Sequence, residues 1–211
     1  MKHNGLFITF EGVEGCGKST QVRLLADAIE AQGYTVLRTR EPGGPPIAEK
    51  IRALLLDPAN TEMLPETEAL LYMASRAQHT GERILPALRR GQVVVCDRYY
   101  DSTLAYQGAA RKLSERAIRA QITFATFGLV PAATILIDLP VEVGLGRIDP
   151  IRADRLERED LAFHQRVRQG FLDVAKVEPQ RYLVVDGQEK IEELHLRIKR
   201  HVYPLLQKME L

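Results

Sequence analysis

Short apolar runs alternate along the chain with longer stretches in which apolar residues recur at helical spacing. The short runs are rich in β-branched residues and predict strands, at residues 6–10, 34–38, 92–96, 133–138 and 181–185. A first helix is predicted where Val22, Leu25, Ala26 and Ile29 share one face, and Gly33 can end it. Further helices are predicted at residues 47–56, 66–90, 114–127, 141–147, 157–175 and 191–206. This alternation predicts one α/β domain over residues 1–211, in which helices cover both faces of a parallel sheet.

The connecting segments are marked by proline, glycine and polar residues. Three prolines exclude a helix at residues 40–46. We expect the helix at 66–90 to break at Pro86, and Pro150 to interrupt the chain between the helices at 141–147 and 157–175. A loop is expected from Asp97 to Gly108, and Ser114 is the expected N-cap of the next helix.

A phosphate-binding sequence follows the first predicted strand. Residues 12–19 read GVEGCGKS and fit the pattern G-x-x-x-x-G-K-[ST] at every fixed position. The strand before it and the helix after it supply the required context. Its three glycines let the backbone approach a phosphate, and N–H groups at the helix start point toward the anion. We expect Lys18 to reach the outer phosphates of a nucleotide and Ser19 to bind magnesium.

Composition limits the classes of partner. The chain has 29 Lys and Arg against 28 Asp and Glu, a net charge of +1, so charge gives no reason to expect a nucleic acid or a membrane surface as partner. Cys16 and Cys96 lack metal-ligand or redox spacing, and we expect free, mostly buried thiols in a reducing compartment. The N-terminal apolar run meets Glu11 too soon for a signal peptide, and no run reaches membrane-spanning length. A cytoplasmic protein is therefore expected.

A phosphate loop predicts nucleotide binding but leaves the reaction open, because GTPases, motor ATPases and small-molecule kinases share it. A guanine-reading Asn-Lys-x-Asp sequence is absent. A kinase would further need an acid for magnesium, a second anion site and mobile positive charge.

Two predicted strands end in an aspartate, Asp97 and Asp138. Asp138 precedes a helix start and suits capping, so we assign the magnesium role to Asp97. Arg98 follows at the carboxyl edge of the sheet, where ligands bind in such folds, and is the leading residue for the second anion site. Arg40 lies at the same edge, although a surface pair with Glu41 is a nearly equal alternative.

Mobile charge is expected in the segment at about residues 147–157, which carries Arg147, Arg152 and Arg155. A mobile loop with spaced arginines can close over ATP and stabilise the transferred phosphoryl group. The alternative is a solvated charged loop in which Asp154 pairs with Arg155. Glu14 occupies a variable position of the phosphate loop, which leaves Lys18 as the only cation there.

With these residues in view, the chain resembles the bacterial thymidylate kinases over nearly its whole length. Four stretches carry the resemblance: GVEGCGKST at residues 12–20, REPGG at 40–44, ASRAQH at 74–79 and DRYYDSTLAYQG at 97–108. The last is close to diagnostic. The resemblance implies a P-loop NTPase-type three-layer fold with strand order 2-3-1-4-5 and a small lid, transfer of the γ-phosphate of ATP to dTMP in dTTP synthesis, Mg²⁺, and a homodimer.

The resemblance also implies residue roles, and the acceptor elements are expected at about residues 40–110. Arg98 would grip the dTMP phosphate, with Glu41 near the sugar-phosphate end and Arg40 assisting. Tyr72 would pack on thymine, Arg76 would donate to a base carbonyl, and Tyr106 would exclude a ribose 2′-hydroxyl. The remaining expected dTMP contacts are Arg52, Thr103 and Gln107. The expected ATP contacts are Gly12, Val13, Glu14, Gly15, Cys16, Gly17, Lys18, Ser19, Thr20 and Arg147. The expected catalytic residues are Lys18, Asp97, Arg98, Arg152 and Arg155.

Glu14 and the arginines at 147–155 indicate the family type whose catalytic arginines lie in the lid. Two features depart from the family pattern: Pro45 and Pro46 follow the glycine loop, and residues 148–150 separate the first lid arginine from the next. We expect Arg152 and Arg155 to serve the γ-phosphate and Arg147 to lie near adenine. Another nucleoside monophosphate kinase, or an ATPase switch without a small-molecule acceptor, are the alternative functions.

Overall fold

Five strands form one parallel sheet in the order β2-β3-β1-β4-β5 in the computed structural model, which describes residues 4–209. The strands are β1 (Leu6–Glu11), β2 (Val36–Arg40), β3 (Val93–Asp97), β4 (Ala133–Asp138) and β5 (Tyr182–Asp186). The predicted fold class and strand order are confirmed. The second strand begins at Val36 and not at Tyr34, because only residues from Val36 onward pair with β3.

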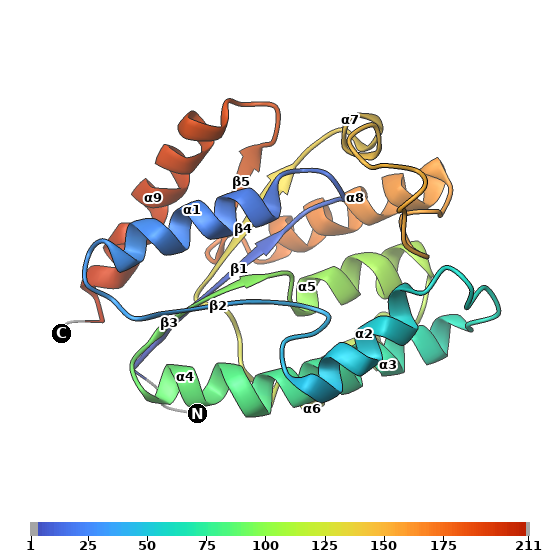
Figure 1. Ribbon diagram of the computed structural model, residues 1–211, viewed down its shortest axis with the longest axis horizontal. Helices are drawn as coiled ribbons and strands as arrows, with labels where there is room; N and C mark the ends of the chain where they lie inside the picture. The colour runs from blue at the N-terminus through green and yellow to red at the C-terminus, as the bar shows by residue number, and fades with distance from the viewer. Residues whose placement is uncertain (1–3, 210–211) are drawn as a thin grey trace.

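Helices cover both faces of the sheet, and α1 and α9 lie together on one face (Figure 1). The helices are α1 (Lys18–Glu30), α2 (Pro46–Leu56), α3 (Pro65–His79), α4 (Leu85–Arg89), α5 (Tyr100–Thr103), α6 (Glu115–Ala125), α7 (Val141–Leu145), α8 (Leu161–Val177) and α9 (Ile191–Gln207), with π-helical segments η1 (Thr80–Ile84) and η2 (Leu104–Ala110). The central strands β1, β3 and β4 are buried almost throughout, as expected for a parallel sheet covered on both sides. None of the helices within residues 4–209 has the length and apolar character that a membrane crossing requires.

The strand register brings the functional segments to one edge. Phe10 and Arg40 both pair with Asp97, so β1, β2 and β3 end at the same level. The phosphate loop, the segment after Arg40 and the segment after Asp97 therefore leave the sheet side by side at its carboxyl edge. Ligands bind at this edge in open α/β sheets.

The segment expected as a loop from Asp97 to Gly108 is instead helical, as α5 and η2. Its apolar side chains, among them Leu104, Ala105 and Tyr106, are buried, and η2 packs against α8. This tertiary packing outweighs the turn-like composition of the segment, so the loop prediction was wrong.

Two boundary predictions also need correction, and a third, Ser114 as N-cap, is confirmed in its position. Pro86 does not break the helical stretch: α4 continues directly from η1, and the regular α-helix gives way earlier, at η1, where the Leu85 N–H donates to the Thr80 carbonyl. Ser114 occupies the N-cap position of α6 without a side-chain capping bond. α8 begins at Leu161 and not at Glu157, because the carboxylate of Asp160 accepts a hydrogen bond from the Phe163 N–H and caps the helix.

Candidate active site

The phosphate loop connects β1 to α1 with the backbone geometry that its glycines permit. Gly12, Gly15 and Gly17 have φ angles of 141°, 68° and 97°, values that residues with a Cβ atom rarely adopt. A Cβ on Gly15 would lie 2.2 Å from the carbonyl oxygen of Gly144. The Lys18 ammonium group donates to the carbonyl oxygens of Gly12 and Val13 at 3.0 and 2.8 Å, so the lysine lies against its own loop.

A hydroxyl and a carboxylate meet next to the loop. Ser19 Oγ donates to Asp97 Oδ2 at 2.6 Å, across a sequence separation of 78 residues. Hard oxygen donors of this kind suit Mg²⁺, which takes its remaining ligands from phosphate and water. Within residues 4–209 no cluster of three or more His, Cys, Asp or Glu side chains offers a closed metal cage.

Asp138, the other strand-end acid, does not cap a helix as predicted. Both of its oxygens accept from Arg168, at 2.7 and 2.8 Å, and Pro140 occupies the N-cap position of α7. The bidentate pair turns the Asp138 carboxylate toward α8, and the α7 N-cap position lies two residues further on, at Pro140.

A cavity of about 470 Å³ opens beside the phosphate loop, a size typical of small-molecule sites. It is lined both by residues of the phosphate loop and by residues that the sequence predicted for the second nucleotide. Its walls include the predicted residues Glu14, Gly15, Gly17, Lys18, Ser19, Thr20, Arg40, Glu41, Arg52, Tyr72, Arg76, Asp97, Arg98, Thr103, Tyr106 and Gln107. Pro42, Leu56, Ser102, Asp154, Leu156 and Glu157 also line it and were not among the predicted residues.

Arg98 lines the cavity and contacts Glu14 of the phosphate loop. Its guanidinium donates to Glu14 Oε1 at 2.9 Å, to the Tyr106 hydroxyl at 3.1 Å and to Ser102 Oγ at 3.1 Å. Tyr106 also donates to Glu14. Burial alone would lower the pKa of Arg98, but Tyr106 and Glu14 outweigh it and hold that pKa well above its ordinary value. Burial would likewise raise the pKa of Glu14, but Arg98, His164, Lys18 and Tyr106 together outweigh it and hold that pKa below its usual range.

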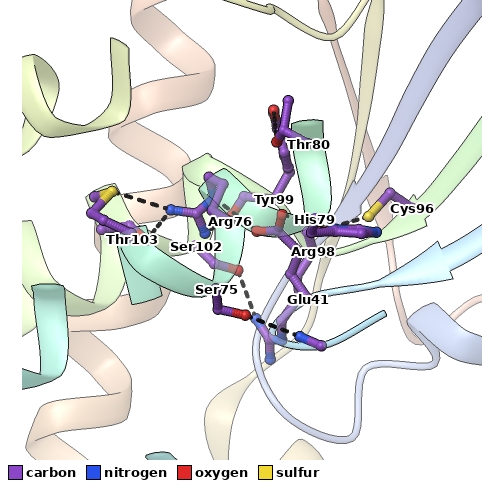
Figure 2. A network of polar contacts seen from close by, with 12 residues as sticks. Glu41, Ser75, Arg76, His79, Thr80, Cys96, Arg98, Tyr99, Ser102 and Thr103 are labelled. Carbon is purple, nitrogen blue, oxygen red and sulfur yellow. Dashed lines mark hydrogen bonds and ion pairs between the residues drawn. The ribbon is translucent and has the colours of Figure 1, made fainter. Parts of the chain in front are cut away.

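A buried network of polar side chains forms part of the cavity wall (Figure 2). Arg76, which is 1% exposed, donates to Glu41 Oε2 at 2.7 Å, to Thr103 Oγ1 at 2.9 Å and to the Tyr99 carbonyl at 3.1 Å. His79 Nδ1 lies 3.0 Å from the other oxygen of Glu41. These hydrogen bonds fix the orientation of the Arg76 guanidinium group in the cavity wall.

The surface pair between Arg40 and Glu41, the alternative to an anion-binding role of Arg40, does not form. Arg40 instead lies 3.0 Å from Glu49, while Glu41 points inward to Arg76. The cause is that β2 ends at Arg40, and the next residue turns into the space between β3 and α3.

The three lid arginines occupy different environments. Arg147 donates to the carbonyl oxygen of Gly15 at 2.8 Å and so borders the phosphate loop. Arg152 is exposed and lies 3.8 Å from Asp149. Arg155 is buried, with a contact of 2.7 Å to Glu68 and a hydrogen bond to the Leu55 carbonyl. The alternative pair between Asp154 and Arg155 does not form, because Asp154 instead accepts the backbone N–H groups of residues 156 and 157. None of these three arginines lines the cavity.

Comparison with known proteins agrees with this geometry. The family model described as Thymidylate kinase matches residues 10–198. The chain belongs to the thymidylate kinase family. It is 51% identical to the thymidylate kinase of Geotalea uraniireducens, over 92% of this chain and 94% of that protein, and 52% identical to that of Geobacter sulfurreducens, over 89% and 92%.

A crystal structure of the thymidylate kinase from Ehrlichia chaffeensis superposes with a TM-score of 0.77 at 32% identity, covering 94% of this chain and 98% of that one. The family resemblance inferred from four short stretches is thus confirmed over nearly the full length. Residues 97–108 carried most of that inference, and seven of them line the cavity.

Proposed function

We propose that this chain transfers the γ-phosphate of ATP to dTMP, giving dTDP and ADP for dTTP synthesis. The observation that carries the proposal is the single cavity bordered by Lys18 and Ser19 on one side and by Arg76, Arg98 and Tyr106 on the other. Two phosphorylated nucleotides would meet there with their phosphates facing each other. The membership of the thymidylate kinase family selects dTMP as the acceptor.

The donor side would hold ATP by the phosphate loop, residues 12–20, with Arg147 beside it. Lys18 would leave the carbonyls of Gly12 and Val13 and reach the β- and γ-phosphates. Ser19 and Asp97 would hold Mg²⁺, directly or through water. When bound, the ion would neutralise charge on the phosphates and orient them for in-line transfer.

The acceptor side would hold dTMP through Arg98 at the phosphate and Tyr72, Arg76, Thr103 and Gln107 around the base. Glu41, whose carboxylate lies behind Arg76, would act through that arginine. Arg40 and Arg52 would border the sugar-phosphate end. Tyr106 would fill the space next to the sugar 2′ carbon, so that a ribose would clash and strand its hydroxyl. The acceptor phosphate is already anionic at neutral pH, and we expect no strong general base.

The segment at about residues 147–157 would close over ATP as a lid. Arg152 is exposed and needs only a movement of this segment to reach a phosphate. Arg155 would first have to leave Glu68, which makes Arg152 the better candidate for the γ-phosphate. An arginine at that place contributes on the order of a thousandfold in rate.

We also propose a cytoplasmic homodimer. Leu70 on α3 and Phe124 on α6 are exposed, Phe124 by 85%, and these helices pack against each other, so their outer side offers an apolar face to a second copy. The free thiols of Cys16 and Cys96 and the nucleotide substrates suit the cytoplasm.

A magnesium-dependent assay that couples ADP release to a second enzyme tests the function, with dTMP, dUMP, UMP, CMP and AMP as acceptors. We expect dTMP to give the highest kcat/KM, and chelation of the metal to abolish turnover. Preferred turnover of CMP or UMP would indicate another nucleoside monophosphate kinase. ATP hydrolysis that no acceptor stimulates would indicate an ATPase switch.

A further inference from the structure

Glu11 is a fully buried carboxylate for which the proposed reaction gives no role. It ends β1 and directly precedes the phosphate loop, and its exposed fraction is 0%. A carboxylate in such a place must have its oxygens satisfied by hydrogen bonds. The partners of Glu11 all lie in the segment that carries Arg98.

Both carboxylate oxygens of Glu11 contact the residues after Arg98. Oε1 accepts the backbone N–H of Tyr99 at 2.7 Å and that of Ser102 at 3.3 Å. Oε2 accepts the Ser102 hydroxyl at 2.6 Å. Ser102 Oγ in turn accepts from Arg98 Nη1 at 3.1 Å. A continuous chain of hydrogen bonds therefore runs from Glu11 through Ser102 to the Arg98 guanidinium.

The backbone of Arg98 needs such support. Its φ angle is 67°, in the left-handed region that costs a side-chain-bearing residue about 1 kcal/mol or more. The Arg98 N–H donates to the Phe10 carbonyl at 2.9 Å, and the next N–H, that of Tyr99, donates to Glu11. Two consecutive residues of β1 thus hold both sides of the turn that aims Arg98 into the cavity.

We propose that Glu11 is a positioning residue for the acceptor phosphate, acting on Arg98 through Ser102 and the turn at Tyr99. This inference rests on the proposed function, in which Arg98 grips the phosphate of dTMP. Glu11 would not contact the substrate itself and would act only by fixing the position of Arg98. It also gives a reason for placing a carboxylate at the last position of a buried strand.

The substitution Glu11→Gln tests the proposal with little change in volume. A glutamine keeps one oxygen for the backbone N–H groups but turns a donor toward Ser102 Oγ. The Ser102 hydroxyl then loses the acceptor that orients its proton, so its contact with Arg98 is no longer fixed. Above pH 8, where a pKa of about 8 leaves Glu11 ionised in the wild type, we expect dTMP to bind about tenfold more weakly, as for the loss of one hydrogen bond to a charged group.

Thymidine, which lacks the phosphate, distinguishes positioning from general damage. Calorimetric titration of the full chain should show thymidine binding within about twofold of wild type in Glu11→Gln, and the KM for dTMP should rise while the KM for ATP stays unchanged. Equal weakening of dTMP and thymidine would overturn the proposal, because it would mean that the whole pocket had deformed. Unchanged dTMP binding would also overturn it.

Two further variants keep the test decisive. Ser102→Ala breaks the chain to Arg98 but leaves the Glu11 contacts to backbone N–H groups, so it should show the same selective loss of dTMP binding even if Glu11→Gln folds poorly. In the double variant the losses should not add, since both changes break one chain; additive losses would argue against it.

Asp101→Asn is the matched control. Asp101 is a neighbouring buried carboxylate, but Arg181 binds it at 2.6 and 2.9 Å, away from Arg98. It should lower stability without changing the ratio of dTMP to thymidine affinity, and an equal shift in that ratio would count against a specific role of Glu11. If the wild-type chain itself bound dTMP no better than thymidine, the proposed function would fail, and not only this inference.

Discussion

Replacing Glu68 with glutamine should destabilise the protein by about 3 kcal/mol, the lower end of what removing one partner of a buried ion pair costs. The Glu68 side chain on α3 is 1% exposed, and it contacts Arg155 at 2.7 Å and Arg111 at 3.0 Å. Gln107 donates to it at 2.8 Å. A neutral amide would retain some of these hydrogen bonds but leave two guanidinium groups with less compensating charge.

The size of the effect follows from what each arginine keeps. Arg111 retains Glu159 as a partner. Most of the cost should therefore come from the Arg155 side chain, which within residues 4–209 keeps the Leu55 carbonyl as its hydrogen-bond partner. For a domain of this size a loss of about 3 kcal/mol lowers the melting temperature by about 6–12 °C. Denaturant unfolding and a thermal melt at pH 7 measure both quantities.

The pH dependence of the same variant gives an independent check. Burial alone would raise the pKa of Glu68, but hydrogen bonds from Arg111 and Gln107 outweigh it and hold that pKa below its unfolded value of 4.5. A lowered folded-state pKa means that ionised Glu68 stabilises the fold above about pH 4.5 and that this contribution is lost as the pH falls further. The difference between wild type and Glu68→Gln should therefore shrink below pH 4.5.

Glu159→Gln is the control, because the Glu159 side chain is 28% exposed and exposed ion pairs contribute about 1 kcal/mol or less. If Glu68→Gln cost no more than Glu159→Gln at pH 7, the argument that Glu68 stabilises the fold mainly through buried Arg155 would be refuted. A pH-independent difference between wild type and Glu68→Gln would refute the charge argument alone.

Three other outcomes follow from the site. Arg98→Lys keeps the charge but loses the planar fork, so the KM for dTMP should rise by about tenfold or more in the ADP-release assay with the KM for ATP unchanged; equal changes in both would contradict the assignment. Tyr106→Ala should raise kcat/KM for a ribonucleotide acceptor relative to dTMP, and an unchanged ratio would remove Tyr106 from the sugar subsite. Burial raises the pKa of Glu11 from 4.5 to about 8, so the contribution of its protonated form to stability is full below about pH 4.5 and is lost as the pH rises through 8. Unfolding titrations should show wild type losing stability relative to Glu11→Gln over this range. Parallel stability curves would contradict the shift.

The positions of the strands were predictable because these elements are locally encoded. The runs at β1, β3 and β4 are mostly apolar and β-branched, and the phosphate loop marks which strand precedes the first helix. The strand order itself came from the family resemblance. The register that aligns Phe10, Arg40 and Asp97 then follows from three strands that end at one edge.

The helical segment after Arg98 was not predictable in the same way. The acceptor for its first N–H groups is Glu11, 88 residues earlier for Tyr99, and its buried face packs on α8. The partner of Arg155 was not predictable for a similar reason, since Glu68 lies on α3 and nothing near Arg155 in the sequence indicates it. Local pattern predicts an element when its stabilising contacts are local, and fails when they come from distant segments.

The distribution of charge in the cavity reconciles a net charge of +1 with a site for two polyanions. Two arginines that line the cavity already have an internal carboxylate: Arg98 has Glu14 and Arg76 has Glu41. These acids reduce the repulsion among buried cations in the ligand-free protein, and they fix the guanidinium groups before a substrate arrives. An incoming phosphate would share Arg98 with Glu14, or displace it, at the moment when the phosphate loop fills. Binding of the two nucleotides is then coupled through a residue of the loop itself, so the affinity for dTMP should depend on whether ATP is bound.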